Sequence, residues 1–377
     1  MVDARRRTVL AILGAGALGA GATYFGASGI DSGGSGDPPA TGTESDDTTM
    51  EGKDADDSDA GDGAVTEAFF TPEMGNTTDT PAIWYGEDDH LLVVTDKEGD
   101  ELFVFDATSG EFRERIGAEG TGLNEFRYPN EVDIVDEWAF VVERDNGRVQ
   151  VLRMPDGESV GTFGENELLA PYGCTIVPDS GGYDIYVTDN YEADGQEDLG
   201  ERIKQYRVSI EESGIEAAFV GAFGATEEPG ALEEVETIYG DPEHDRLVIA
   251  DEANQSIKLY GLDGEFHGTV TSVFDDSSLD RGNDPEGIAL YRSNGDGGGY
   301  WFFTEQADPS VFHVVDRESL EYRTQFSGET TANTDGVWLT QESFGPFSAG
   351  AFYADHDDRR VAAFDLADIE REIEGFD

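Results

Sequence analysis

The chain is short of several residue types that whole classes of protein depend on. Cys174 is its single cysteine, so it can form neither an intrachain disulfide nor a thiolate metal cluster. Its 23 basic residues, only four of them lysine, face 83 acidic residues, and its formal net charge is −60. So negative a field repels nucleic acid, and we expect no nucleic-acid partner. The acidity is typical of a halophilic protein, because salt near 1 M shortens the Debye length to about 3 Å and screens the repulsion.

A Gly/Ala-rich apolar run near the N-terminus is short for a membrane-spanning helix, which needs about 20 predominantly apolar residues. Arg6 and Arg7 precede this run, in a pattern that resembles a twin-arginine export signal. We therefore expect residues 1–26 to direct export, giving a secreted or cell-surface protein. The segment is then either cleaved or kept as an N-terminal membrane tether.

Residues 27–66 consist largely of Gly, Ser, Asp and Thr and have almost no large apolar side chains. Such a segment cannot bury enough surface to offset the entropy lost on ordering, which predicts a disordered acidic linker. The folded domain is then expected over residues 67–377.

Short apolar strand patterns recur six times in this domain, about every fifty residues. The copies are ELFVFD (101–106), RVQVLR (148–153), RIKQYRV (202–208), SIKLYGL (256–262), VFHVVD (311–316) and RVAAFDL (360–366). Two strand patterns precede each copy and one follows most of them, while helical periodicity is confined to the last dozen residues. This repeat predicts an all-β, six-bladed β-propeller with four-stranded blades.

The sixth repeat lacks a clear fourth strand, and the segment EAFFTP (67–72) is available to supply it. Closure of the ring by this N-terminal strand would join the two chain ends and remove an exposed edge. We expect a closed, highly charged propeller of this kind to be monomeric.

In a propeller, equivalent positions of successive repeats become neighbours around one rim. Acidic residues are frequent there at the start of the innermost strands and at the end of the strands that follow. The first set is Asp79, Glu131, Tyr172, Glu236, Asp284, Glu286 and Asp335, and the second is Lys97, Arg144, Asp189, Glu252, Glu305 and Asp355. Carboxylates without histidine or cysteine favour an oxygen-only site of the kind that Ca²⁺ occupies. One alternative is a purely structural ion that plugs the channel.

Lys97 and Arg144 are predicted to hold the same position in adjacent blades of a chain with few basic residues. They either bind an anion such as phosphate at the acidic rim or neutralise neighbouring carboxylates. We find no covalent nucleophile motif, so any catalysis is expected to use metal-activated water. Of the five histidines only His356, in ADHDD, is placed where it could contact the site.

Seven motifs, in order from residue 68 to the C-terminus, resemble those of β-propeller phytases. They are DTPAIW (79–84), TDKEG (95–99), NEVDI (130–134), PYG (171–173), VIADE (248–252), DPEGIALY (284–291) and NTDGVWL (333–339). The resemblance implies a calcium-dependent phosphomonoesterase, similar to a 3-phytase, that releases phosphate from phytate or related esters with the help of several calcium ions.

The resemblance also implies roles for particular residues. The calcium ligands would be Glu236, Glu252, Asp284, Glu286 and Asp335, with Glu329 in place of a shorter carboxylate and Asp79 at the remaining rim position. Lys97, Arg144 and Tyr172 would contact substrate phosphate. Among these, Asp284, Glu286, Lys97 and Arg144 are the predicted catalytic residues.

The chain departs from the phytase pattern at two places, and other families remain open. Thr80 follows Asp79 where the family pairs two aspartates, and Asp189-Asn190 stands where the family has a second lysine. The segment 120–157 also resembles an NHL-type repeat, which is typical of binding propellers. The alternatives are therefore a non-catalytic exported binding propeller and a calcium-dependent lactonase.

Overall fold

The computed structural model describes residues 63–373, except for 75–76, 88, 212–213, 272, 274–283 and 294–296. The predicted export segment and nearly all of the predicted linker lie outside this range. Among the described residues, no helix is both long enough and apolar enough to cross a membrane.

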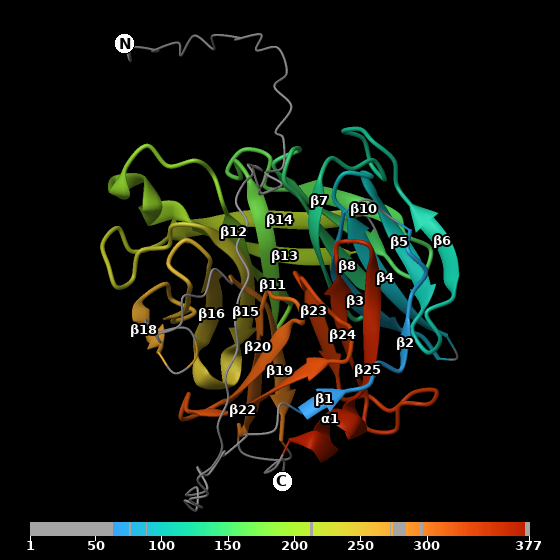
Figure 1. The fold of residues 1–377 in the computed structure, drawn as a ribbon. Coiled ribbons are helices and arrows are strands. Elements are labelled where there is room, and N and C mark those ends of the chain that lie inside the picture. Colours follow the sequence, from blue (N-terminus) through green and yellow to red (C-terminus); the bar gives the residue numbers. More distant parts are fainter. Residues whose placement is uncertain are drawn as a thin grey trace, which may run out of the picture. The chain divides into compact units, whose positions relative to one another are not determined.

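Antiparallel sheets of four strands follow one another along the chain and form a six-bladed β-propeller, as predicted (Figure 1). Blade 1 comprises β3 (Thr78–Tyr85), β4 (His90–Asp96), β5 (Glu101–Asp106) and β6 (Phe112–Ile116). Blade 2 comprises β7 (Pro129–Val135), β8 (Trp138–Glu143), β9 (Arg148–Arg153) and β10 (Glu158–Phe163). Blade 3 comprises β11 (Pro171–Asp179), β12 (Gly182–Asp189), β13 (Ile203–Glu211) and β14 (Gly214–Phe223), with a short 3-10 helix, Gln196–Glu201, between β12 and β13.

The remaining blades repeat this order. Blade 4 comprises β15 (Val235–Asp241), β16 (Arg246–Asp251), β17 (Ser256–Tyr260) and β18 (Phe266–Val270), with the 3-10 turn Pro242–His244 after β15. Blade 5 comprises β19 (Pro285–Arg292), β20 (Gly299–Glu305), β21 (Val311–Asp316) and β22 (Tyr322–Gly328). Blade 6 comprises β23 (Val337–Thr340), β24 (Ala351–His356) and β25 (Arg360–Asp365).

The fourth strand of blade 6 comes from the N-terminal side of the domain, as predicted. Strand β2 (Phe69–Phe70) pairs antiparallel with β25, with Phe69 opposite Ala363. This pairing closes the ring and covers what would otherwise be the free edge of β25.

The fold begins earlier than the sequence predicts, at Gly63 rather than Glu67. Strand β1 (Gly63–Val65) pairs in parallel with β22 and adds a fifth strand to blade 5. Val65 is buried in one cluster with Phe326 and Leu366. The composition of residues 27–66 does not predict this strand. Its three residues contain one large apolar side chain, Val65, and burial of that side chain holds the strand against β22. The short helix α1 (Leu366–Glu372) follows β25 at the predicted C-terminal position and begins at Asp365, whose side chain accepts a hydrogen bond from the Ala367 N–H.

The core lies between the blades. Apolar side chains of blade 1, such as Ala82 and Val93, share a cluster with Val132 and Val141 of blade 2. Cys174 is buried in the corresponding cluster between blades 2 and 3. The middle strands are covered on both faces, which explains their nearly continuous apolar sequences and stabilises the ring by about 25 cal/mol for each Å² of apolar surface buried.

A recurring irregularity sets the geometry at one rim. The pairing of the innermost strand with the next strand shifts near the start of β3, β7, β11, β15 and β19. Such β-bulges bend a strand and redirect its side chains. The residues that follow the first position of these strands are therefore turned out of the regular alternation.

Candidate metal centre

One side chain from each blade belongs to a set that we call the inner ring. In blades 1 to 5 it is the second residue of the innermost strand, and in blade 6 it lies two residues before β23. The inner ring consists of Asp79, Asn130, Tyr172, Glu236, Glu286 and Asp335. The sequence analysis assigned Glu131 and Asp284 to this position, and both are displaced from it along the chain. Asn130, not Glu131, follows Pro129 in blade 2, and Asp284 precedes Pro285.

A second set of side chains, the outer ring, follows the end of the next strand in blades 1 to 5. In these five blades its backbone N–H donates to the carbonyl just before the innermost strand, as in Lys97 to Thr77 and Glu252 to Glu234. The outer ring consists of Lys97, Arg144, Asn190, Glu252 and Gln306, together with His356, the aligned last residue of β24 in blade 6. Asp189, Glu305 and Asp355, predicted here, lie one residue earlier.

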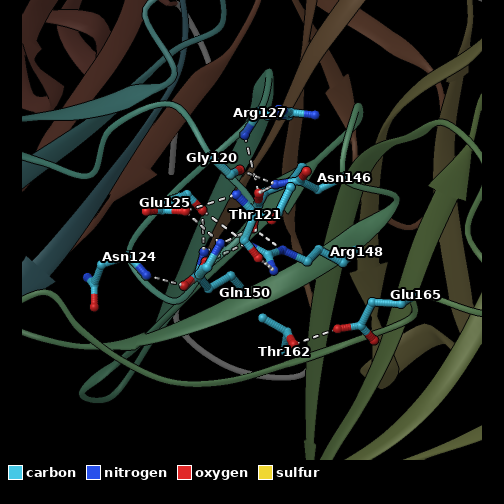
Figure 2. A network of polar contacts seen from close by, with 12 residues as sticks. Gly120, Thr121, Asn124, Glu125, Arg127, Asn146, Arg148, Gln150, Thr162 and Glu165 are labelled. Carbon is cyan, nitrogen blue, oxygen red and sulfur yellow. Dashed lines mark hydrogen bonds and ion pairs between the residues drawn. The ribbon is translucent and has the colours of Figure 1, made fainter.

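The acidic residues one position earlier hold the rim loops in place. Asp189 accepts hydrogen bonds from the backbone N–H groups of Leu169 and Ala170, and Asp355 accepts one from the Thr78 hydroxyl. In blade 2 the equivalent Glu143 binds Arg148 at 2.7 Å, within the network of Arg148, Gln150 and Asn146 that Figure 2 shows. Because these carboxylates are saturated by the protein itself, their role is structural.

Three glutamates from blades 4 and 5 converge at the rim, and we call them the glutamate triad. Carboxylate oxygens of Glu236, Glu252 and Glu286 all lie within 4.8 Å of one another. Glu236 and Glu286 come from the inner ring and Glu252 from the outer ring. The bulge in each innermost strand makes this possible, because it turns Glu236 and Glu286 toward Glu252 instead of placing them in regular alternation.

The triad is electrostatically unfavourable without a cation. Burial, followed by the neighbouring Glu252 carboxylate, raises the pKa of Glu236 well above its ordinary value. Burial and then the Glu236 and Glu252 carboxylates do the same to the pKa of Glu286. Like charges at this separation cannot all ionise unless a proton or a cation lies between them.

The donor set of the triad fits a hard divalent cation. It offers carboxylate oxygens alone, from three different strand positions, and such a set suits Ca²⁺ or Mg²⁺ better than softer metals. The ordinary alternative, an exposed acidic patch, does not describe it, because Glu286 is only 5% exposed. These three residues are therefore the part of the predicted ligand set that the structure brings together.

The ammonium group of Lys97 contacts two carboxylates of the inner ring, so it is not free to bind phosphate. Its ammonium group lies 2.8 Å from Asp79 Oδ2 and 3.3 Å from Asp335 Oδ2. Burial alone would lower the pKa of Lys97, but the Asp79 and Asp335 carboxylates outweigh burial and hold that pKa above its ordinary value. Of the two roles open from the sequence, neutralisation of carboxylates is the one that these contacts favour.

Asp79 and Asp335 are accordingly paired with the ammonium group of Lys97. Burial raises the pKa of Asp79, and Lys97 opposes this effect. Burial also raises the pKa of Asp335 to about 6, with Lys97 lowering it and Asp358 raising it. Asp335 also accepts a hydrogen bond from Gln306 of the outer ring. A metal ion would therefore compete with Lys97 for these two carboxylates.

Tyr172 connects the two sides of the rim. Its hydroxyl acts to lower the pKa of the neighbouring Glu236 carboxylate, against the effect of burial. Burial raises the Tyr172 pKa well above its ordinary value, and the surrounding carboxylates, first Asp79 and then Glu236, add to the effect. Tyr172 therefore stays protonated and is a hydrogen-bond donor at the edge of the triad.

Arg144 is the more accessible of the two predicted anion-binding residues. Its guanidinium carbon lies 3.4 Å from the centre of the Tyr128 ring, and its Nε donates to Asp145 Oδ1 at 2.7 Å. The side chain remains 36% exposed. The stacked ring holds the guanidinium in one orientation, which suits it to bind an anion with the exposed part of the group.

The other predicted site residues lie outside the triad. Asp284 Oδ1 is 3.5 Å from Gln255 Nε2, and Glu329, exposed beyond the outermost strand of blade 5, accepts a hydrogen bond from Thr66. His356 is buried, and its Nδ1 contacts the backbone of Ala332.

Sequence reasoning also missed Asn130, Asn190 and Gln306 as ring members. Alignment of the prolines that begin β7, β11 and β19 would have placed Asn130 in the inner ring.

A family model described as a six-bladed β-propeller matches residues 84–197, which is less than a third of the chain. The chain finds no match among curated proteins. The class that fold and comparison define is therefore a six-bladed β-propeller protein, and the phytase-like assignment goes beyond them.

Proposed function

We propose that this protein is a calcium-dependent phosphomonoester hydrolase whose glutamate triad holds the metal ion. The observation that carries the proposal is the convergence of Glu236, Glu252 and Glu286 within 4.8 Å at the rim. Arg144, a partly exposed arginine of blade 2, lies at the same rim. An acidic rim repels an anionic substrate unless a cation offsets its charge. Metal binding and phosphate binding are thus coupled in this proposal.

A bound calcium ion would neutralise the triad, polarise a phosphoryl oxygen and activate water. The protein's own residues supply the rest. Tyr172 stays protonated, and its single O–H proton serves to orient the Glu236 carboxylate. Arg144 binds phosphate oxygens and stabilises the charge that develops on them. Lys97 keeps Asp79 and Asp335 neutralised, so that these carboxylates do not repel the substrate.

The experiment is a measurement of inorganic phosphate released in high salt from phytate and from a simple phosphomonoester, with calcium and with EDTA. We expect release that requires calcium. Protein that binds calcium normally but releases no phosphate from any ester would overturn the enzyme proposal.

A second candidate is a non-catalytic binding propeller, favoured by one specific observation. The family match covers residues 84–197, and this range contains the segment 120–157 that resembles an NHL-type repeat. In that case calcium stabilises the protein without turnover. Calcium-dependent melting together with complete inactivity toward esters is the result that supports this candidate.

Export by the twin-arginine pathway remains a prediction, since Arg6 and Arg7 lie outside the described residues. Replacement of both arginines by lysine is expected to retain the protein in the cytoplasm. Fractionation of cells that express the two forms checks this, and normal appearance of the variant outside the cell would contradict it.

A further inference from the structure

A pocket of about 450 Å³ lies between the segment that follows β12 and the residues that precede β15, and its lining includes Ala253, the residue after Glu252 of the triad. It is lined by Asn190, Tyr191, Gln196 and Arg202 on one side and by Glu233 and Glu234 on the other. Lining residues of the pocket connect it to the candidate metal centre, although the triad carboxylates do not line it. Asn190 belongs to the outer ring, and the Glu252 N–H donates to the Glu234 carbonyl at 3.0 Å.

The one basic residue that lines this pocket is not available to an anion. Arg202 is 3% exposed, and its guanidinium group donates to backbone carbonyls on both sides. Nε binds Leu232 O at 3.1 Å and Nη2 binds Glu233 O at 2.6 Å, while Nη1 binds the carbonyls of Asp189 and Tyr191. Arg202 therefore joins the two walls, and its donors are used within the protein.

The groups that the pocket does present are carboxylates, amides and a phenol ring. Glu192, Glu233 and Glu234 are exposed there, and the Tyr191 ring stacks on Arg202 at 4.6 Å. A second phosphate in this space would face several carboxylates and no free cation, and like-charge juxtaposition costs several kcal/mol. Hydroxyl groups can donate to these carboxylates and accept from the amides of Asn190 and Gln196.

We infer that this pocket binds the alcohol part of the substrate, and that it selects phosphate esters of uncharged, hydroxyl-rich compounds such as sugars and polyols over compounds with several phosphates. The inference rests on the proposed function and narrows its substrate class. Glu234 is then a specificity-determining residue, because it lies on the pocket wall that adjoins Glu252.

The test compares kcat/KM for phosphate release from glucose 6-phosphate and from phytate, at saturating calcium and fixed high salt. Wild type is expected to prefer the monophosphate. Glu234→Lys is expected to shift the ratio toward phytate by about tenfold, because it replaces a repelling charge by an attracting one. The matched control is Glu137→Lys, the same charge change at an exposed position in the turn between β7 and β8, at the opposite end of the blades.

A wild-type preference for phytate, or a ratio that Glu234→Lys and Glu137→Lys leave equally unchanged, overturns this inference and leaves the hydrolase proposal intact. Absence of phosphate release from every ester overturns the hydrolase proposal and this inference with it. Calcium-induced stabilisation of both variants, followed by thermal melting, shows that they are folded.

Discussion

The rim and the axial cavity behind it both hold buried carboxylates, but the groups that surround these carboxylates differ. The cavity has a volume of about 450 Å³ and is lined by residues of all six innermost strands, among them Glu131 and Asp133 of β7. Burial raises the pKa of Glu131 well above its ordinary value, the Asp133 carboxylate adds to this effect, and the Cys174 N–H opposes it. Burial also raises the pKa of Asp133, and the N–H groups of Ile134 and Ile176 oppose it. Glu286 in the triad instead has the carboxylates of Glu236, Glu252 and Asp335 as its main neighbours.

The difference follows from the position of the strands. β11 is the innermost strand of its sheet, so alternate N–H groups along it point away from β12 and need acceptors. Such N–H groups, of Cys174 and Ile176, act on Glu131 and Asp133 of the neighbouring β7 and oppose the rise of their pKa values. Glu236 and Glu286 of the triad lie in the bulges, outside the regular strand pairing. The comparison shows that burial alone does not make a metal site, because nearby backbone N–H groups offset part of the cost of burying a carboxylate.

Removal of a triad carboxylate should have the largest effect. Glu286→Gln is expected to abolish calcium-dependent phosphate release and the calcium-induced gain in stability, which is about 2.7 kcal/mol at a hundredfold excess over Kd. Calorimetric titration and thermal melting in high salt check this. Glu131→Gln in the cavity is the control and should keep the full calcium response. A calcium response in Glu286→Gln equal to that of wild type would remove this residue from the site.

Removal of the exposed arginine should separate turnover from metal binding. Arg144→Ala is expected to lower kcat for phosphate release by a factor on the order of 10²–10³, because it removes a contact to the developing charge. Calcium affinity should not change, since Arg144 contacts Asp145 and Tyr128 and none of the triad. Arg127→Ala, which removes an exposed arginine of the loop before β7 at the same rim, is the control. Unchanged turnover would leave Arg144 without a role in the reaction.

A pH dependence should come from the cavity. Burial raises the pKa of Asp133 to about 7, well above its unfolded value. The native state then binds a proton more tightly than the unfolded state, so Asp133 lowers stability as the pH rises from about 4 to about 7. Asp133→Asn removes this ionisation.

We expect the free energy of unfolding of Asp133→Asn to fall less steeply than that of wild type between these pH values, by about 1.4 kcal/mol for each unit of pKa difference. Denaturant unfolding at several pH values measures this, with the exposed Glu137→Gln as control. If the free energy of unfolding depended on pH in the same way for wild type and Asp133→Asn, the pKa of Asp133 would be the same in the folded and unfolded states.

The smallest effect is expected outside both regions. Glu329→Gln should change stability by less than about 0.5 kcal/mol and leave calcium binding unaltered, because Glu329 is exposed and contacts Thr66 rather than the triad. Calcium titration of this variant beside Glu286→Gln provides the comparison. A weakened calcium response would return Glu329 to the ligand set.

The sequence by itself was enough for the fold and for the general location of the site. Six repeats of apolar strands, with EAFFTP left over to close the ring, predicted the six-bladed propeller and the pairing of Phe69 and Phe70 with β25. Strand periodicity and repeat spacing are local properties, and each blade follows them. The same repeats placed Glu236, Glu252 and Glu286 at one rim, where the structure brings them together.

Tertiary structure alone decided which acidic residues meet. The bulge near the start of five innermost strands adds residues without changing the repeat, so the sequence alignment placed Glu131 where Asn130 lies and grouped Asp284 with Glu286. Lys97 was open to two roles until its distances to Asp79 and Asp335 were known. These outcomes depend on contacts between blades distant in sequence, and such contacts are set by packing around the axis, which no local pattern encodes.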